Sequence, residues 1–327
     1  MGRRFDRDDR MAKGVLCVKK ISILIPCFNE RDNVVPMYEA VTKLIGESLS
    51  SYDYELLFID NASTDGTREL LRGICSQDKH VHAILNARNF GMFNSQYHGM
   101  LQTSGDCTIM LYCDFQEPLD LIPEMVKAWE EGSRIVVMQK TKSRENRLMY
   151  FVRTCYYKLM QNFSDIEQIE HFTGFGLYDK TFINLMKDLK DPVPFLRGIV
   201  AEFGYKIKII HYTQQNRRAG KSHYNFLALY DAAMYGFTAY TKFGLRAATL
   251  LGFLTGIGST FAGLVYLIAK ILWWDSFSVG IAPIVTGMFF LGAVILIFLG
   301  LMGEYIISIN RRLMNRPLVI EEERINF

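Results

Sequence analysis

The sequence predicts an α/β fold with a mostly parallel sheet, followed by a two-helix transmembrane hairpin. Short apolar runs alternate with helical patterns along residues 21–112, which is typical of βαβ units and a parallel sheet. Further along, residues 247–269 and 276–303 contain no charged side chain. Because about 20 apolar residues are enough for a helix to cross a bilayer, these two stretches are expected to span a membrane.

Strands and helices are expected to alternate through the first third of the chain. The expected strands are 21–26, 56–59, 82–85 and 108–112, and the expected helices are 33–49, 67–76 and 94–103. Ligands of open α/β sheets bind beyond the carboxyl ends of the strands. The residues that directly follow each strand are therefore the candidates for a binding site.

Composition divides the chain into five parts. They are a basic flexible tail (1–20), an α/β domain (21–222), an interfacial or juxtamembrane helix (223–246), two transmembrane helices (247–309) and a cytoplasmic tail (310–327). Lysine and arginine lie outside both apolar stretches, so the positive-inside rule places the domain and both chain ends in the cytoplasm. The aromatic segment before the first span either lies in the membrane interface or packs under the domain.

Charge and cysteine content exclude some classes of protein. The formal net charge is only +3, and no dense run of Lys and Arg occurs beyond the first twenty residues. We therefore expect no nucleic-acid partner. The six cysteines include no C-x-x-C pair, so we interpret them as reduced thiols in a cytosolic setting.

Two of the polar segments that follow strands carry candidate chemistry. Asp60 ends the second strand, where an acid can hydrogen-bond a ribose hydroxyl or a base N–H; the residues after it also fit an ordinary turn and helix cap. Asp114 and Gln116 follow the fourth strand, and in an extended chain they would point to the same side. A divalent cation that carries a diphosphate needs only one or two such oxygen ligands.

The order of short motifs resembles family 2 glycosyltransferases of the GT-A fold. It is most similar to the polyprenyl-phosphate group, which includes bactoprenol glucosyltransferases and dolichol-phosphate mannose synthases. The matching segments are Pro26–Glu30 (P-x-x-N-E), Asp60–Thr67 (D-D-G-S-x-D-G-T), Arg88–Gly91 (R-N-x-G), Gly105–Asp106 (G-D), Asp114–Pro118 (D-L-Q-x-P), Phe195–Gly198 (F-R-G) and Arg217–Tyr224 (R-x-x-G-x-S-x-Y). The resemblance covers about residues 20 to 312.

This resemblance implies a GT-A catalytic domain at 21–222 that binds a nucleotide sugar. The implied reaction is inverting transfer of a hexose from a UDP- or GDP-sugar to a polyprenyl phosphate at the cytoplasmic membrane face, with Mg²⁺ or Mn²⁺ as cofactor. The product would be a lipid-linked sugar for modifying a cell-envelope glycan. The implied location is a bacterial inner membrane. The resemblance does not decide between a monomer and a homo-oligomer.

The resemblance also assigns roles to individual residues. The catalytic candidates are Asp114, Arg217 and Glu170, and the metal candidates are Asp114 and Gln116. The candidates for nucleotide-sugar binding are Pro26, Asn29, Glu30, Asp60, Ser63, Asp65, Arg88 and Asn89. The candidates for the acceptor phosphate are Arg197, Arg217, Lys221 and Ser222, since guanidinium groups bind phosphate bidentately. Arg197 could instead pair with Glu202, and Asn89 could simply cap the next helix.

The chain also departs from the family pattern. Tyr112 stands where D-x-D-x-Q has its first acid, Asn61 and Ala62 replace an acid and a glycine, and Gly174 stands where many relatives have an aspartate that is a proposed base. A lipid phosphate is already ionised, so a strong general base is less necessary. Glu170 and His171, just upstream, are the fallback candidates.

Two other functions stay open at this point. A processive polysaccharide synthase is suggested by the partial Q-x-x-R from Gln214 to Arg217, but Arg218 stands where that motif needs tryptophan, and two spans are too few for a translocation pore. A non-catalytic membrane scaffold or nucleotide-sugar sensor is suggested by the missing acids at Tyr112 and Gly174.

Overall fold

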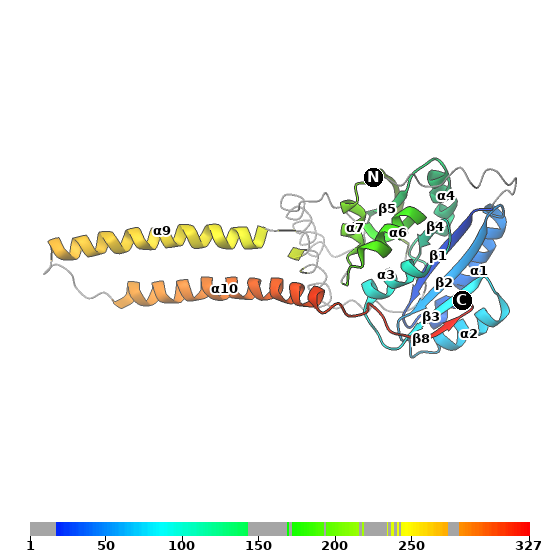
Figure 1. Ribbon diagram of the computed structural model, residues 1–327, viewed down its shortest axis with the longest axis horizontal. Helices are drawn as coiled ribbons and strands as arrows, with labels where there is room; N and C mark the ends of the chain where they lie inside the picture. The colour runs from blue at the N-terminus through cyan, green and yellow to red at the C-terminus, as the bar shows by residue number, and fades with distance from the viewer. Residues whose placement is uncertain are drawn as a thin grey trace.

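The computed structural model of the chain describes residues 18–142, 169, 172–192, 194–215, 218, 234, 237, 238, 241, 243–273 and 281–327. Within them, one eight-stranded sheet has the order β7-β5-β6-β4-β1-β2-β3-β8 (Figure 1). The strands are β1 (Lys20–Cys27), β2 (Asp53–Asp60), β3 (Val81–Asn86), β4 (Cys107–Met110), β5 (Ile135–Lys142), β6 (Phe172–Asp179), β7 (Ile207–Thr213) and β8 (Glu321–Ile325). The helices are α1 (Arg31–Ser48), α2 (Thr67–Gln77), α3 (Met92–Gln102), α4 (Ile122–Glu130), α6 (Lys180–Leu189), α7 (Leu196–Glu202), α9 (Phe243–Leu272) and α10 (Ile281–Leu313).

The first four strands confirm the predicted parallel arrangement. β1 pairs in parallel with β2 and β4, and β2 pairs in parallel with β3. Their central residues are mostly apolar because both faces of the sheet are covered. In β1, Ile23 and Ile25 belong to one buried cluster, whereas Leu24 belongs to the cluster on the other face. The fourth strand ends at Met110, two residues earlier than expected.

The second half of the sheet is mixed. β6 runs antiparallel to both β4 and β5, and β5 pairs in parallel with β7. Taken together, most neighbouring strands of the sheet are parallel, as the sequence predicts. The carboxyl-terminal ends of β4, β1, β2 and β3 lie side by side at one edge of the sheet.

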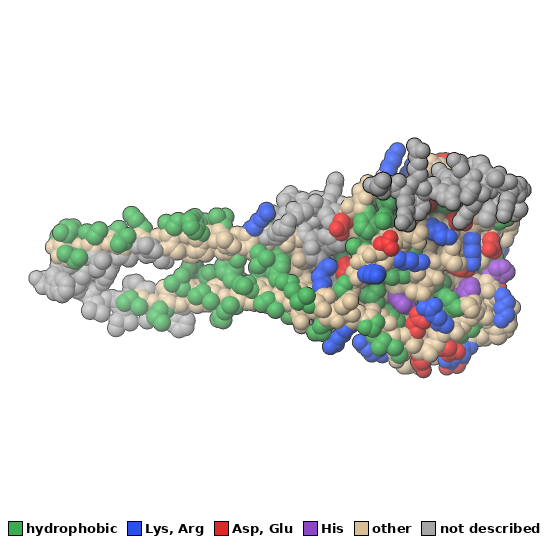
Figure 2. All heavy atoms as spheres, viewed as in Figure 1, with side chains coloured by type: hydrophobic (Ala, Val, Ile, Leu, Met, Phe, Trp, Pro, Cys, Tyr) green, Lys and Arg blue, Asp and Glu red, His purple; other side chains and the backbone are tan. Residues whose placement is uncertain are grey.

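The helices α9 and α10 extend together away from the sheet domain (Figure 1), and their visible surface is mostly hydrophobic (Figure 2). Among the described residues, one helical stretch, Phe290–Leu313, is long and apolar enough to cross a membrane, and its apolar window is not buried. The predicted two-span hairpin is therefore not confirmed. Most of the expected juxtamembrane helix at 223–246 lies outside the described residues.

The C-terminal segment 310–327, predicted as a cytoplasmic tail, contains the end of a helix and a strand. α10 continues to Leu313, and β8 then pairs antiparallel with β3 at the edge of the sheet. The sequence prediction missed β8 because its sequence, EEERI, lacks the regular apolar alternation of a half-buried strand. Its position depends on a partner strand more than two hundred residues earlier in the chain.

Candidate functional site

Hydrogen bonds join the loops after β1 and β2 at the carboxyl-terminal edge of the sheet. The backbone N–H of Asn29 donates to Ser63 Oγ (2.8 Å), and the N–H of Thr64 donates to Asn29 Oδ1 (2.9 Å). The N–H of Glu30 donates to Thr67 Oγ1 (3.0 Å). The structure thus brings the predicted ligands Asn29, Glu30 and Ser63 together, with Asn29 and Ser63 holding the two loops in place.

Asp65 forms part of the same junction. Its Oδ1 accepts hydrogen bonds from the backbone and hydroxyl of Thr67, and its Oδ2 accepts one from the backbone of Arg31 (3.0 Å). Burial would raise the pKa of this carboxyl, but these hydrogen bonds outweigh burial and lower the pKa of Asp65 from its ordinary value. The side chain is therefore ionised at neutral pH and stabilises the turn before α2.

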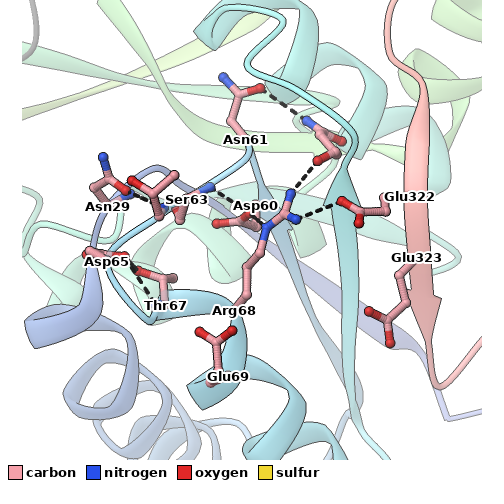
Figure 3. A network of polar contacts seen from close by, with 12 residues as sticks. Asn29, Asp60, Asn61, Ser63, Asp65, Thr67, Arg68, Glu69, Glu322 and Glu323 are labelled. Carbon is pink, nitrogen blue, oxygen red and sulfur yellow. Dashed lines mark hydrogen bonds and ion pairs between the residues drawn. The ribbon is translucent and has the colours of Figure 1, made fainter.

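Asp60 lies fully buried beneath the β2 loop. Its Oδ2 accepts hydrogen bonds from the backbone of Ser63 (3.0 Å) and from Arg68 Nε (2.8 Å), as Figure 3 shows. Its Oδ1 is buried and accepts no hydrogen bond from any described residue. Asp60, which the sequence predicts to bind the nucleotide, thus also stabilises the loop that follows β2.

The side-chain amide of Asn61 connects the loop after β2 to the loop after β3. From the sequence alone, Asn61 is only a departure from the family pattern. Asn61 Oδ1 accepts hydrogen bonds from the backbone of Phe90 (3.0 Å) and from Asn86 Nδ2 (3.2 Å), and its Nδ2 donates to Asn89 Oδ1 (2.9 Å). Asn89 Oδ1 also accepts from the backbone of Gly91 (2.8 Å), directly before α3. Asn89 thus holds the turn that leads into α3.

Arg88 and Pro26 occupy different surroundings at this edge. The exposed Arg88 guanidinium lies 4.1 Å from the centre of the Phe90 ring. Pro26 is the penultimate residue of β1 and pairs in register with Ile59 of β2. Of these two candidates, only Arg88 has an exposed side chain that is available for a charged ligand.

Three residues with strained backbone lie in these loops. Asn29, Ala62 and Phe115 have positive φ angles of 56°, 66° and 59° and follow β1, β2 and β4. Such conformations cost energy for residues other than glycine, and they cluster at functional sites. Their gathering at one edge of the sheet supports a binding site there.

The candidate metal ligands Asp114 and Gln116 sit in a turn, which corrects the extended geometry expected from the sequence. The backbone N–H of Gln116 donates to Asp114 Oδ1 (3.2 Å), and the positive φ of Phe115 folds the chain between them. Asp114 is only 6% exposed. The sequence prediction was wrong on this geometry because aspartate can bond the backbone two residues ahead.

The chain that leads into the predicted phosphate-binding loop docks on this turn. Gln214 Nε2 donates to Gln116 Oε1 (3.0 Å), and the backbone N–H of Gln215 donates to Gln116 O (3.0 Å). The backbone N–H of Arg218 donates to Asp114 O (3.2 Å). The candidates Arg217, Lys221, Ser222 and Glu170 themselves lie outside the described residues.

Tyr112 and Gly174, two positions where an acid of the family is absent, lie close together in the structure. Tyr112 Oη donates to the carbonyl of Thr173 (2.8 Å). A Cβ atom built at Gly174 would lie 3.2 Å from Tyr112 Oη and 2.4 Å from Met110 Cε, and Gly174 has a φ of +112°. The positive φ at Gly174 therefore disfavours any side chain, including the acid that many relatives carry, whereas the Met110 methyl group could move aside.

Arg197 lies on α7 with a buried Nε atom that has no hydrogen-bond partner among the described residues. Within the described part of the chain no ion pair joins it to Glu202. The described residues also hold no group of three or more His, Cys, Asp and Glu side chains that could bind a metal by themselves.

The fold and the order of its motifs define a family, and comparison with known proteins identifies it. The sequence model of the family "Glycosyl transferase family 2" matches residues 22–191 of this chain. The chain belongs to this family, is a transferase and has a GT-A-like α/β fold.

The relatives cover nearly the whole chain. The bactoprenol glucosyl transferase of Shigella phage SfX is 29% identical over 93% of this chain and 99% of that protein. The putative glycosyltransferase CsbB of Bacillus subtilis is 30% identical over 93% of this chain and 91% of that protein. A solved structure of mannosyl-3-phosphoglycerate synthase from Rubrobacter xylanophilus is 16% identical, with a TM-score of 0.47 over 73% of this chain and 75% of that one.

Proposed function

We propose that the protein transfers a hexose, with inversion, from a UDP- or GDP-sugar to a polyprenyl phosphate at the cytoplasmic face of a membrane. One observation carries most weight. Three hydrogen bonds, from Gln214, Gln215 and Arg218, join the chain around the start of the basic loop at 216–222 to the Asp114–Gln116 turn. This contact supports placing the cations of that loop close to the reaction centre, where they can bind the acceptor phosphate. The names of the phage relatives support a bactoprenol-type acceptor and glucose as the sugar.

A divalent cation fits the residues at this turn. Asp114 supplies a largely buried carboxylate and Gln116 an amide oxygen, and each oxygen can accept more than the one hydrogen bond described. Oxygen ligands of this kind suit Mg²⁺ or Mn²⁺, which keep most of their coordination for water and phosphate. When bound, such a cation would neutralise charge on the leaving diphosphate.

The protein's own residues would supply positioning and charge. Arg217 and Lys221 would bind the acceptor phosphate, with Ser222 and Arg197 completing that site. The ionised phosphate oxygen would attack the anomeric carbon as the nucleotide diphosphate leaves. The glycine conformation at Gly174 supports a reaction without a general base at that position.

The path of the chain supports two membrane spans. β8 belongs to the same sheet as β1–β7, so a chain that crosses the membrane along Phe290–Leu313 has to cross it a second time. α9 is the helix placed to do this, because it begins near the sheet domain and runs beside α10 (Figure 1). The cations that flank the uncharged stretches 247–269 and 276–303 on the side of the domain are Lys242, Arg246, Arg311 and Arg312. This distribution of charge favours a cytoplasmic domain.

The test is a donor screen with purified protein and polyprenyl phosphate, in which the released nucleotide and the size of the product are measured. We expect one nucleotide sugar to be consumed and a single sugar to be added to the lipid. A polymeric product would favour a processive synthase, and an absence of turnover with any donor would favour a scaffold or sensor.

We expect Asp114→Ala to lower turnover at least about a hundredfold, because several kcal/mol of charge stabilisation depend on the cation site. The matched control is Asp120→Ala, which removes an exposed acid from the same segment. Normal turnover in Asp114→Ala, with both variants equally folded, would refute the metal assignment.

We expect Arg217→Ala to lower turnover sharply even in detergent, where no anionic lipid is present. If this loop only held the membrane surface, at about 1 kcal/mol for each cation, the detergent-solubilised variant and parent would turn over alike. That result would remove the acceptor-site assignment.

A further inference from the structure

The C-terminal strand β8 lies against two loops of the donor site. Antiparallel pairing places Glu321 beside Asn86 at the carboxyl end of β3. The backbone N–H of Ala87, the first residue of the β3 loop, donates to Ile320 O (2.9 Å). The returning chain is thus fixed where the β3 loop begins.

A single arginine connects β8 to the β2 loop. Arg68 Nε donates to Asp60 Oδ2 (2.8 Å), its Nη1 donates to Glu322 Oε2 (2.8 Å), and its Nη2 donates to the carbonyl of Asn86 (Figure 3). Asp60 in turn accepts the backbone N–H of Ser63 (3.0 Å). The guanidinium therefore holds the ends of β2, β3 and β8 at once.

This arrangement matters because Asp60 is fully buried while the Arg68 side chain is 15% exposed. A buried carboxylate is stable only with a well-placed partner. Three acceptors in different directions fix the guanidinium more firmly than one would, since a planar arginine loses less freedom for each further hydrogen bond. Glu322 supplies one of those three acceptors from β8.

We propose that β8 is a clamp on the donor site, in which Glu322 acts through Arg68 to position the loops at 60–67 and 86–91. Both are positioning residues. The assignment of these loops to the donor rests on the proposed function, whereas the clamp itself is a property of the fold. In this arrangement the chain that returns from α10 completes the nucleotide-binding edge of the domain.

The chain provides a matched control on the same strand. Glu323 pairs with Arg72 (2.8 Å). The hydrogen bonds and ion pairs of Arg72 to described residues go to Glu69 of α2 and to Glu323, and neither partner lies in the loops at 60–67 and 86–91. The Glu323 side chain is 40% exposed, against 56% for Glu322. Glu322→Ala and Glu323→Ala each remove one ion pair between β8 and α2. Only the first removes a contact that leads to Asp60.

The experiment uses the full-length protein in detergent, with hydrogen exchange of the loop amides and steady-state kinetics on the donor. For Glu322→Ala we expect faster exchange at 61–66 and 87–91 and a donor KM about threefold higher with kcat within about twofold, the size expected for a partly exposed ion pair. Glu323→Ala should leave both measurements as in the parent. Glu322→Gln, which keeps an oxygen acceptor, should recover part of the loss.

A second variant, Arg68→Lys, keeps the charge but cannot reach all three acceptors, and we expect its donor KM to rise about tenfold. Equal loop exchange and equal KM in Glu322→Ala and Glu323→Ala would overturn the clamp. Faster loop exchange in Glu322→Ala alone, in a protein that consumes no nucleotide sugar, would uphold the clamp and refute the proposed function instead.

Discussion

At the scale of single residues, the departures from the family pattern have local physical reasons. Asn61 has to accept and donate hydrogen bonds at the same time, since its Oδ1 receives two of them and its Nδ2 gives one to Asn89. An acid at this position would have no N–H to donate. The amide therefore suits its neighbours in this chain.

We predict that Asn61→Asp lowers stability by about 1–3 kcal/mol, because a buried carboxylate would face the acceptor oxygen of Asn89. Flipping the Asn89 amide would repair that contact only by removing the acceptor for the N–H of Gly91. Thermal unfolding in detergent measures the change. An unfolding midpoint equal to or above that of the parent would contradict this account of the junction.

We predict that Gly174→Asp restores the family's acid without gaining activity. The positive φ makes any side chain there costly, on the order of 1–3 kcal/mol for the backbone. Gly174→Ala is the matched control, since it carries the same strain without a carboxylate. Higher turnover in the aspartate variant than in the alanine variant would show that a base is useful at this position.

At the scale of elements, a buried carboxylate joins strands at the amino-terminal side of the sheet. Glu55 in β2 accepts hydrogen bonds from Ser22 of β1 (2.6 Å) and from the backbone of Ser104 before β4 (2.7 Å), and it pairs with Lys20 (2.8 Å). Burial alone would raise the pKa of Glu55, but these partners lower it to about 2.

We predict that this network stabilises the sheet at neutral pH and is lost in acid. Since the folded pKa of Glu55 lies at about 2 against an ordinary 4.5, its contribution is complete above about pH 4.5 and falls as the pH drops toward 2, by up to about 3 kcal/mol. Glu55→Gln should therefore unfold more easily than the parent at pH 7, with a difference that narrows below about pH 4.5. A difference that stays constant down to pH 3.5 would exclude this origin.

At the scale of the whole molecule, the returning C-terminal chain fixes the relation between the helices and the sheet. The domain lies at one end of α9 and α10, and the chain that leaves through α9 comes back to form β8 (Figure 1). With both helices across a membrane, as proposed, the domain and the C-terminus would lie on the same side of it.

We predict that a membrane-impermeant thiol reagent labels Ser278→Cys, in the connection between the helices, from outside intact cells. Phe327→Cys should be labelled only after the cells are opened, because β8 keeps the C-terminus beside the domain, which we propose to be cytoplasmic. The reverse pattern would overturn the topology, and protection of both positions in intact cells would contradict a pair of full spans.

The sequence by itself determined the features that depend on neighbouring residues. The apolar runs at 21–26 and 56–59 predicted parallel strands, because strands covered on both faces are mostly apolar. The motifs after them predicted the family by their resemblance to it, and their place at the strand ends predicted the binding edge. The uncharged stretches likewise predicted long apolar helices.

Only the tertiary structure decided what depends on partners far apart in the chain. β8 is a strand because β3 offers it an edge. Arg68 is a bridge because both Asp60 and Glu322 pair with it. Met110 and Tyr112 lie beside Gly174 because β4 pairs with β6. Local patterns contain no information on such contacts, since each of these residues meets its partner only when the sheet has assembled.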